Sequence, residues 1–322
     1  DLSVKLGVPN ACTRCHTDQS NAWAVDTMHS WYGGIKQDWQ DFAIVLHEAR
    51  RGNPAVAPEL ETLINNQSMP AIVRATLLRE LPRYLSATSL AVIQAALLDP
   101  DPIVRQATIN ALSNTNPNLR LKVLFPMLDD SVRAGRLAAT RALMDLPVDQ
   151  LDEQQNEKLY MAITEYEKSL KVNADRPEAM VQLGVLYSVQ GRYLDAEHTY
   201  QRAIKLDDHF NAAYVNLADL FAQQQREVEG RAILKQGLTV LPEDPDLHHA
   251  LGLSLIRSQQ YDAAMPELAR AAKQAPENAR YTYVYAVALH SMGNARQAIT
   301  TLETALQQHP YDCLLYTSDA AD

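Results

Sequence analysis

The sequence predicts an all-α protein in which a short helical segment is followed by an α-solenoid. Residues 177–312 repeat every 34 residues, with small and apolar side chains returning at fixed repeat positions. Upstream, residues 55–150 contain three related helical segments. No stretch shows the alternation of apolar and polar residues that is typical of a half-buried strand. The two repeat regions therefore indicate stacked helices.

A five-residue motif near the start, Cys12-Thr13-Arg14-Cys15-His16, has the spacing of a haem c attachment sequence. Two thiols at this spacing can form thioethers with the two vinyl groups of one porphyrin, and the adjacent histidine can bind the iron. A zinc site would need further Cys or His pairs, and a thioredoxin-like motif would need a strand before it. We therefore predict one covalent haem c held by Cys12 and Cys15, with His16 as the proximal iron ligand.

Two helices are expected after this motif. Ser20 can cap a helix over residues 21–31. Gly33-Gly34 interrupts the pattern, and a second amphipathic helix is expected over residues 38–50.

The two predicted helices carry the candidates for the sixth iron ligand, His29 and His47, with Met28 as a thioether alternative. We favour His47, since its helix can fold back over the opposite face of the ring. His29 would then be free to serve a second haem. Either histidine alone is more often a surface or packing residue.

Residues 55–150 carry three segments with a helix-starting Asp or Pro followed by Val-Arg. The best example is Asp101-Pro102-Ile103-Val104-Arg105, and this region resembles HEAT repeats. We expect Arg74, Arg105 and Arg133 to have structural roles, bonding neighbouring repeats or helix caps.

Residues 151–312 carry the strongest repeat signal, with a partial repeat followed by four full ones starting at Pro177, Asn211, Pro245 and Ala279. This pattern resembles the tetratricopeptide repeat. Small residues at repeat positions 8, 20 and 27 allow paired helices to approach closely. The resemblance implies a concave groove lined by the first helix of each pair. A carboxylate-bearing peptide could bind there; the alternative is an ordinary solvated face. The candidate groove residues are Asp219, His249, Arg257, Arg280, Tyr283 and His290.

The net charge and the absence of certain motifs argue against several classes of partner and function. The 322 residues carry a formal net charge of −10, which argues against nucleic acid as a partner, and no apolar run is long enough to span a membrane. No phosphate-binding glycine loop, nucleophile elbow or His-Glu-x-x-His motif is present. We therefore expect an electron carrier rather than a catalyst.

The ends of the chain prompt two further expectations. The sequence starts at Asp1 without a leader, so we expect an internal fragment of a longer protein, and haem attachment implies export to the periplasm or the cell exterior. Residues 313–322 resemble the translation of a sequencing-library transposon adapter, and we expect them not to be biological.

Taken together, the haem motif, the Trp31-Tyr32-Gly33 sequence and the two repeat regions resemble bacterial exported multihaem c-type cytochromes with a C-terminal repeat array. The resemblance implies that residues 1–54 are the end of a multihaem domain, and that the chain transfers electrons to a redox protein partner. Two alternatives stay open. One is part of a multihaem reductase whose active haem lies upstream. The other is a tetratricopeptide scaffold with a vestigial haem motif.

Overall fold

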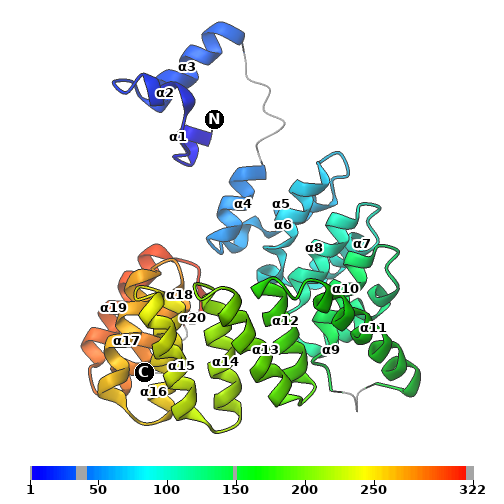
Figure 1. The fold of residues 1–322 in the computed structure, drawn as a ribbon. Helices are drawn as coiled ribbons and strands as arrows, with labels where there is room; N and C mark the ends of the chain where they lie inside the picture. Colours follow the sequence, from blue (N-terminus) through cyan, green and yellow to red (C-terminus); the bar gives the residue numbers. More distant parts are fainter. Residues whose placement is uncertain (1, 34–41, 148–150, 317–322) are drawn as a thin grey trace. The chain divides into compact units, whose positions relative to one another are not determined.

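The computed structural model describes residues 2–33, 42–147 and 151–316, which form helices and connecting turns with no strand among them (Figure 1). The predicted all-α solenoid is therefore confirmed. The chain divides into two compact units between Val123 and Leu124.

The first three helices form a small segment around the Cys-x-x-Cys-His motif. They are α1 (Leu2–Lys5), α2 (Ala11–Cys15) and α3 (Asn21–Tyr32), and both α1 and α2 contact α3. The Asn21 side chain donates to the Ser3 carbonyl at 2.9 Å. Ser20 caps α3 as predicted, because its hydroxyl accepts from the backbone N–H of Trp23 at 3.1 Å.

The remaining helices of the first unit are short. They contact one another in pairs, α5 with α6 and α7 with α8. The predicted helix start at residue 38 lies outside the described residues. From Phe42 onward the helix α4 buries Val45 and Ala49, and the Tyr84 hydroxyl donates to the Ala49 carbonyl at 2.6 Å. α4 is thus bonded to the repeat helices. The elements are α4 (Phe42–Arg50), η2 (Pro54–Val56), α5 (Ala57–Asn65), α6 (Ala71–Leu78), η3 (Leu81–Tyr84), α7 (Ala87–Leu97), α8 (Pro102–Leu112) and α9 (Pro117–Leu124).

The predicted structural role of the arginines is confirmed. Arg74 forms a buried ion pair with Asp99, whose side chain also accepts from the backbone N–H of Asp101 at 2.9 Å. Arg105 donates to the Asp99 carbonyl at 2.8 Å. Arg133 donates to Glu165 at 3.1 Å.

The second unit consists of helix pairs stacked in register. The first helix of each full tetratricopeptide repeat begins at residue 177, 211, 245 or 279, and these are the predicted repeat starts. Helix α14 contacts both α12 and α16, so these first helices share one layer. The elements are η4 (Phe125–Asp129), α10 (Arg133–Leu143), α11 (Glu153–Val172), α12 (Pro177–Val189), α13 (Tyr193–Leu206), α14 (Asn211–Gln223), α15 (Glu227–Val240), α16 (Pro245–Arg257), α17 (Tyr261–Gln274), α18 (Ala279–Ser291), α19 (Ala295–Gln308) and α20 (Cys313–Tyr316).

The small residues lie where paired helices meet. All members of repeat positions 8, 20 and 27 are buried. A Cβ atom added at Gly184 would lie 2.7 Å from Cδ1 of Tyr200, and one added at Gly252 would lie 2.5 Å from Cδ2 of Leu268. The close approach predicted for these positions is therefore confirmed.

The turn between the two helices of each repeat uses a left-handed residue at position 15. Gly191 and Gly293 have φ values of +71° and +84°, while Gln225 and Gln259 have φ values of +61° and +58°. Glycine adopts this conformation without steric cost, whereas glutamine does not. Two of the four turns therefore carry backbone strain.

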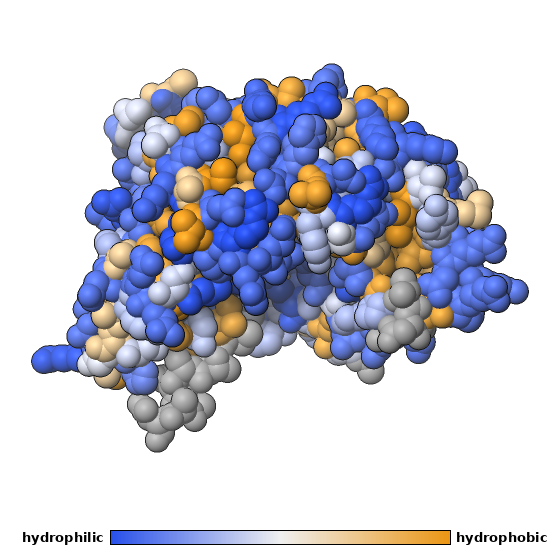
Figure 2. All heavy atoms as spheres, turned by 60° about the horizontal axis from the view of Figure 1, so that its bottom comes forward, coloured by the Kyte–Doolittle hydropathy of each residue, from blue (hydrophilic) through white to orange (hydrophobic). Residues whose placement is uncertain are grey.

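The surface is mixed. On the face shown in Figure 2, apolar side chains are interspersed with hydrophilic ones. No helix in the described parts of the chain combines the length and apolar character needed to cross a membrane.

Candidate functional site

The Cys-x-x-Cys-His motif forms a short, accessible helix. The Asn10 side chain caps α2 by accepting from the backbone N–H of Cys12 at 2.9 Å. Cys12 is partly buried and Cys15 is exposed, and both thiols are free. His16 is the C-cap residue, and its ring lies 5.1 Å from that of Trp23, centroid to centroid.

This segment fits a covalent haem because it has little core of its own. Among residues 2–33 only Ser3 and Ala24 are buried, whereas Trp31 and Tyr32 are 68% and 74% exposed. Aromatic side chains normally bury most of their area in a folded core. A macrocycle held by the two thiols would offer these side chains an apolar partner.

The candidate sixth ligands lie on different helices. His29 is exposed near the end of α3, and His47 is exposed on α4. Residues 34–41, which connect the two helices, lie outside the described residues. The choice between His29 and His47 stays a prediction.

Four candidate groove residues meet in one pocket of about 370 Å³. We call it the inner-face pocket, because α14, α16 and α18 are the first helices of three successive repeats. Asp219 comes from α14, His249 and Arg257 from α16, and Arg280 from α18. Among the described residues, the lining is Ala212, Val215, Asn216, Asp219, Asp246, His249, Ala250, Leu253, Arg257, Asn278, Arg280 and Tyr281.

The other two candidates lie elsewhere. Tyr283 is partly buried against Ala279, Ala305 and Leu315. His290 is exposed in the last turn of α18. Neither is among the described residues that line the inner-face pocket.

His249 is the least satisfied polar group of the pocket. The residue is only 8% exposed, and neither ring nitrogen has a hydrogen-bond partner among the described residues. The ring stacks on Tyr281 with centroids 4.3 Å apart. Burial, and to a lesser extent the Arg280 charge, lower the pKa of His249 to about 4, while the Asp246 charge opposes this shift. The ring is therefore neutral near pH 7.

The Tyr281 hydroxyl donates to Asp246, and the Asn211 amide donates to the other oxygen of the same carboxylate at 2.9 Å. Burial raises the pKa of Tyr281, and the bond to Asp246 raises it further. Tyr281 was not predicted, because repeat position 3 usually packs inside the array. A tyrosine at this apolar position is the signal that could have identified it.

The remaining charges of the pocket differ in how they are paired. Arg257 donates to Glu227 at 2.6 Å, whereas Arg280 forms no ion pair with any described residue. Asp219 is exposed to solvent and has no hydrogen-bond partner among the described residues. Although its side chain is accessible, partial desolvation by the surrounding pocket atoms raises the pKa of Asp219, and the Arg257 charge only partly opposes this rise. The pocket thus has one unpaired cation and one unpaired carboxylate.

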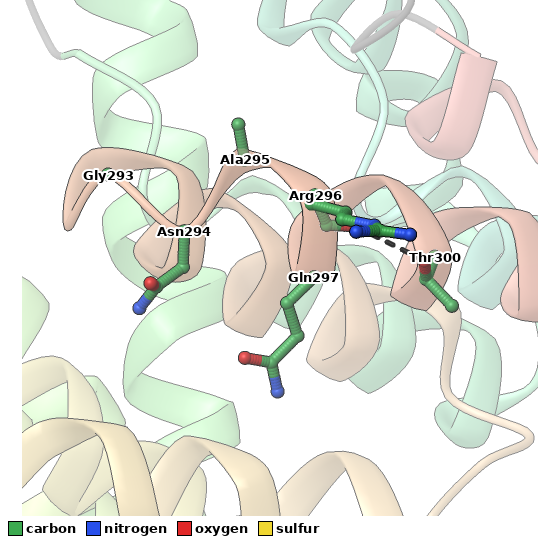
Figure 3. Close-up of a pocket in the computed structure, with 6 residues that line it drawn as sticks. All are labelled: Gly293, Asn294, Ala295, Arg296, Gln297 and Thr300. Atoms are coloured by element: carbon green, nitrogen blue, oxygen red, sulfur yellow. Dashed lines mark hydrogen bonds between the residues drawn. The ribbon is translucent and has the colours of Figure 1, made fainter.

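Two other features carry no comparable chemistry. A pocket at the start of α19 is lined by Gly293 to Gln297 and Thr300, all exposed, and Figure 3 shows Asn294 and Gln297 pointing away from Arg296. Asp207, Asp208 and His209 bring three ligand-type atoms within 4.8 Å of one another, but all three residues are exposed. Both features are open to solvent, so neither forms an enclosed binding site.

Three solved structures of helical-repeat proteins each align with more than 60% of the chain. TTC0263, a tetratricopeptide protein of Thermus thermophilus, shares 19% identity over 64% of this chain and 98% of its own, with a TM-score of 0.43. A MamA structure (residues 41 to the end) from Desulfovibrio magneticus RS-1 shares 12% over 62% of this chain and 99% of its own, with a TM-score of 0.37. YrrB, described as a tetratricopeptide protein with an unusual peptide-binding site, shares 16% over 64% and 100%, with a TM-score of 0.38.

Comparison with protein-family models identifies the two kinds of repeat in the sequence. No curated protein matches the chain significantly. Residues 57–144 match the model for HEAT repeats, and residues 181–246 and 255–316 match two models for the tetratricopeptide repeat. The chain therefore contains HEAT repeats followed by tetratricopeptide repeats.

Proposed function

We propose that the tetratricopeptide array binds an extended peptide that carries a carboxylate, and that the inner-face pocket is the binding site. The observation that carries this proposal is the unpaired Arg280 beside the unsatisfied, buried His249. Stacked helical repeats expose a concave surface of this kind for protein partners. The chain is then an interaction scaffold.

The pocket has the composition of a peptide-binding surface. Val215, Ala250 and Leu253 form apolar lining, while Asp219 and Arg280 supply opposite charges from α14 and α18. Apolar lining with a few polar groups is typical of ligand sites. A guanidinium without a protein partner can bind a carboxylate through two parallel hydrogen bonds.

Selection of random peptides displayed on phage against the full chain tests the proposal. We expect enrichment of peptides with an acidic residue or a free C-terminus next to an apolar residue. Arg280→Glu should abolish this enrichment, because it places a negative charge where the carboxylate binds. Arg296→Glu, an exposed arginine of α19 outside the pocket, is the matched control and should leave it unchanged. Enrichment that survives Arg280→Glu would overturn the proposal.

We also propose that the chain is an exported cytochrome in which Cys12 and Cys15 hold one haem c through thioethers and His16 binds the iron. The accessible thiols and the exposed Trp31 and Tyr32 favour this second function. A bound haem supplies one-electron exchange at its iron. The repeat array would dock the redox protein partner.

The cytochrome proposal is tested on the full chain expressed with a haem-attachment system and exported to the periplasm. The spectrum in alkaline pyridine should give one c-type haem per chain. Cys12→Ala/Cys15→Ala should give none, and Cys313→Ala, which removes the third cysteine of the chain, should keep it. Reduced spectra of His29→Ala and His47→Ala then identify the sixth ligand. A colourless but folded wild-type chain would overturn this function and leave the scaffold.

A further inference from the structure

Two adjacent histidines of α16 differ in how their ring nitrogens are bonded. In His248 the Nδ1 atom lies 2.5 Å from Oε2 of Glu267, and Nε2 lies 2.9 Å from the Pro242 carbonyl. In His249 both ring nitrogens are buried and have no hydrogen-bond partner among the described residues. A buried polar group without a partner costs about 1–3 kcal/mol. His249 thus has hydrogen-bonding capacity that no described residue uses.

The charged and titratable groups that face His249 come from three helices. They are Asp219 on α14, Asp246 and Arg257 on α16, and Arg280 and Tyr281 on α18. Asp244, just before α16, also lies close enough to act on Tyr281.

Most of these groups are already satisfied within the protein. Asp246 accepts from Tyr281 and Asn211, and Asp244 accepts from Asn211 at 2.8 Å. Arg257 pairs with Glu227. Arg280 is the cation that faces His249 without a carboxylate of its own among the described residues. Both side chains line the inner-face pocket, so an anionic group that enters it could contact both.

A carboxylate fits this place better than a phosphate. One unpaired guanidinium balances one negative charge, and Asp219 and Asp246 in the same pocket would repel a second. A carboxylate offers only acceptors, so it satisfies a ring nitrogen that carries a proton. It also neutralises the Arg280 charge that opposes protonation of the ring in the free chain.

We propose that His249 takes up a proton from solvent when a peptide carboxylate binds between it and Arg280, so that the inner-face pocket holds its ligand more tightly as pH falls. This inference rests on the proposed peptide binding and adds its regulation. Proton uptake and ligand binding strengthen each other by the same factor, as linkage requires.

The sign of the pH dependence follows from the two states of the ring. In the free chain the pKa of His249 is about 4, and a bound carboxylate raises it. Between the free and the bound pKa the affinity increases by at most about tenfold for each unit of pH lowered. Above the bound pKa the ring is neutral in both states, and the affinity no longer depends on pH through His249.

Three short probes test this on the full chain between pH 7.5 and 5.5, above the range in which the probe carboxylates protonate. Acetyl-Leu-Glu-amide carries a side-chain carboxylate, acetyl-Leu-Gln with a free C-terminus carries a terminal one, and acetyl-Leu-Gln-amide carries none. NMR titration should show binding of one or both acids that tightens on acidification, and no such effect for the neutral probe. Calorimetry at pH 6 in two buffers of different ionisation enthalpy should show net proton uptake when the peptide binds.

Two variants separate the proposal from a general effect of pH. His249→Gln keeps a polar side chain but cannot titrate, so its affinity should be flat over this range. His290→Gln, an exposed histidine of α18 outside the pocket, should keep the wild-type slope. Circular dichroism shows whether each variant is folded, and the buffer comparison on the wild type needs no variant.

The outcomes are distinguishable. If an acid probe binds with a flat pH profile and no proton uptake, the inference is overturned and the peptide-binding function stands. If neither acid probe binds at any pH, the peptide-binding function itself is overturned.

Discussion

Gly184 on α12 lies directly against the phenol ring of Tyr200 on α13, with room for a hydrogen atom but not for a methyl group. Cζ of the ring would be 2.8 Å from an added Cβ atom, which is inside van der Waals contact. The pair fixes how closely the two helices of the first full repeat approach. The same two repeat positions bring Gly252 against Leu268.

Replacing Gly184 by alanine should destabilise the protein. In a solvent-exposed helix, replacing glycine by alanine raises the free energy of unfolding by about 1 kcal/mol. Here the overlap of the added methyl group with the Tyr200 ring should outweigh this gain, so that the net loss is about 1–3 kcal/mol. Thermal unfolding followed by circular dichroism gives the sign. Gly184→Ala/Tyr200→Leu should recover part of the loss, since the second repeat combines Ala218 with Leu234. A raised melting temperature for Gly184→Ala alone would contradict the close approach.

Gln225→Gly and Gln259→Gly should each stabilise the protein. Both glutamines hold φ near +60°, a conformation that costs a non-glycine residue about 1–2 kcal/mol. Greater freedom of glycine in the unfolded chain offsets part of the gain, so we expect about 0.5–1 kcal/mol each by denaturant titration. Gln236→Gly, in the interior of α15 at an exposed position, should destabilise by about 1 kcal/mol and is the matched control.

Asp99→Asn should destabilise the first unit by about 3 kcal/mol at pH 7, because it leaves Arg74 buried without its counter-ion. The side chains of Arg74 and Asp99 are 6% and 2% exposed. Glu80→Gln breaks the pair with Arg50, which is 59% exposed, and should cost less than about 1 kcal/mol. Equal effects of the two variants in urea titration would contradict the role of burial.

The stabilisation by Asp99 should also depend on pH. Burial acts to raise the pKa of this carboxyl, but the bonds from Arg74 and the Asp101 backbone N–H outweigh it and lower the pKa below its ordinary value. Asp99 therefore makes its full contribution to the free energy of unfolding above its unfolded-state pKa of about 3.9. This contribution is lost as pH falls through the folded-state pKa. The unfolding free energies of the wild type and Asp99→Asn, measured by urea titration, should therefore begin to converge only as pH falls below about 4.

Haem attachment should protect the first three helices from proteases. Lys5 and Arg14 are exposed in this segment, which buries only Ser3 and Ala24 among residues 2–33. A covalent haem would add apolar contacts and reduce local opening, so trypsin should cut the haem-loaded chain more slowly there than Cys12→Ala/Cys15→Ala. Cleavage within the tetratricopeptide array serves as the internal control. Identical rates at Lys5 and Arg14 would show that this segment gains no order from the cofactor.

The repeat architecture could be predicted because a 34-residue period is a property of the chain itself. Positions such as Leu183, Leu217 and Leu251 recur and are buried. Asp219, His249 and Arg280 stand at repeat positions 9, 5 and 2, which the resemblance to the tetratricopeptide repeat places on the groove side of the first helices. The left-handed Gln225 and Gln259 could not be predicted, because glutamine gives no sequence signal for positive φ.

The hydrogen bonding of the pocket escaped prediction for a different reason. Tyr281 lies at a repeat position that packs inside, yet its hydroxyl reaches Asp246 of the preceding repeat. His248 and His249 are neighbours of the same residue type, and only three-dimensional packing decides that one ring is satisfied and the other is not. A sequence pattern that is defined within one repeat does not predict which side chains will contact each other between neighbouring repeats.

The inner-face pocket draws its polar residues from three successive repeats, through Asp219, His249 and Arg280. The fold is modular, because a whole 34-residue unit can be lost or duplicated without breaking the helical register. The inner-face pocket is not modular, because removing residues 245–278 would join two intact repeats and erase the pocket. Duplication of a repeat can thus lengthen such an array, while a pocket of this kind depends on side chains from several adjacent repeats.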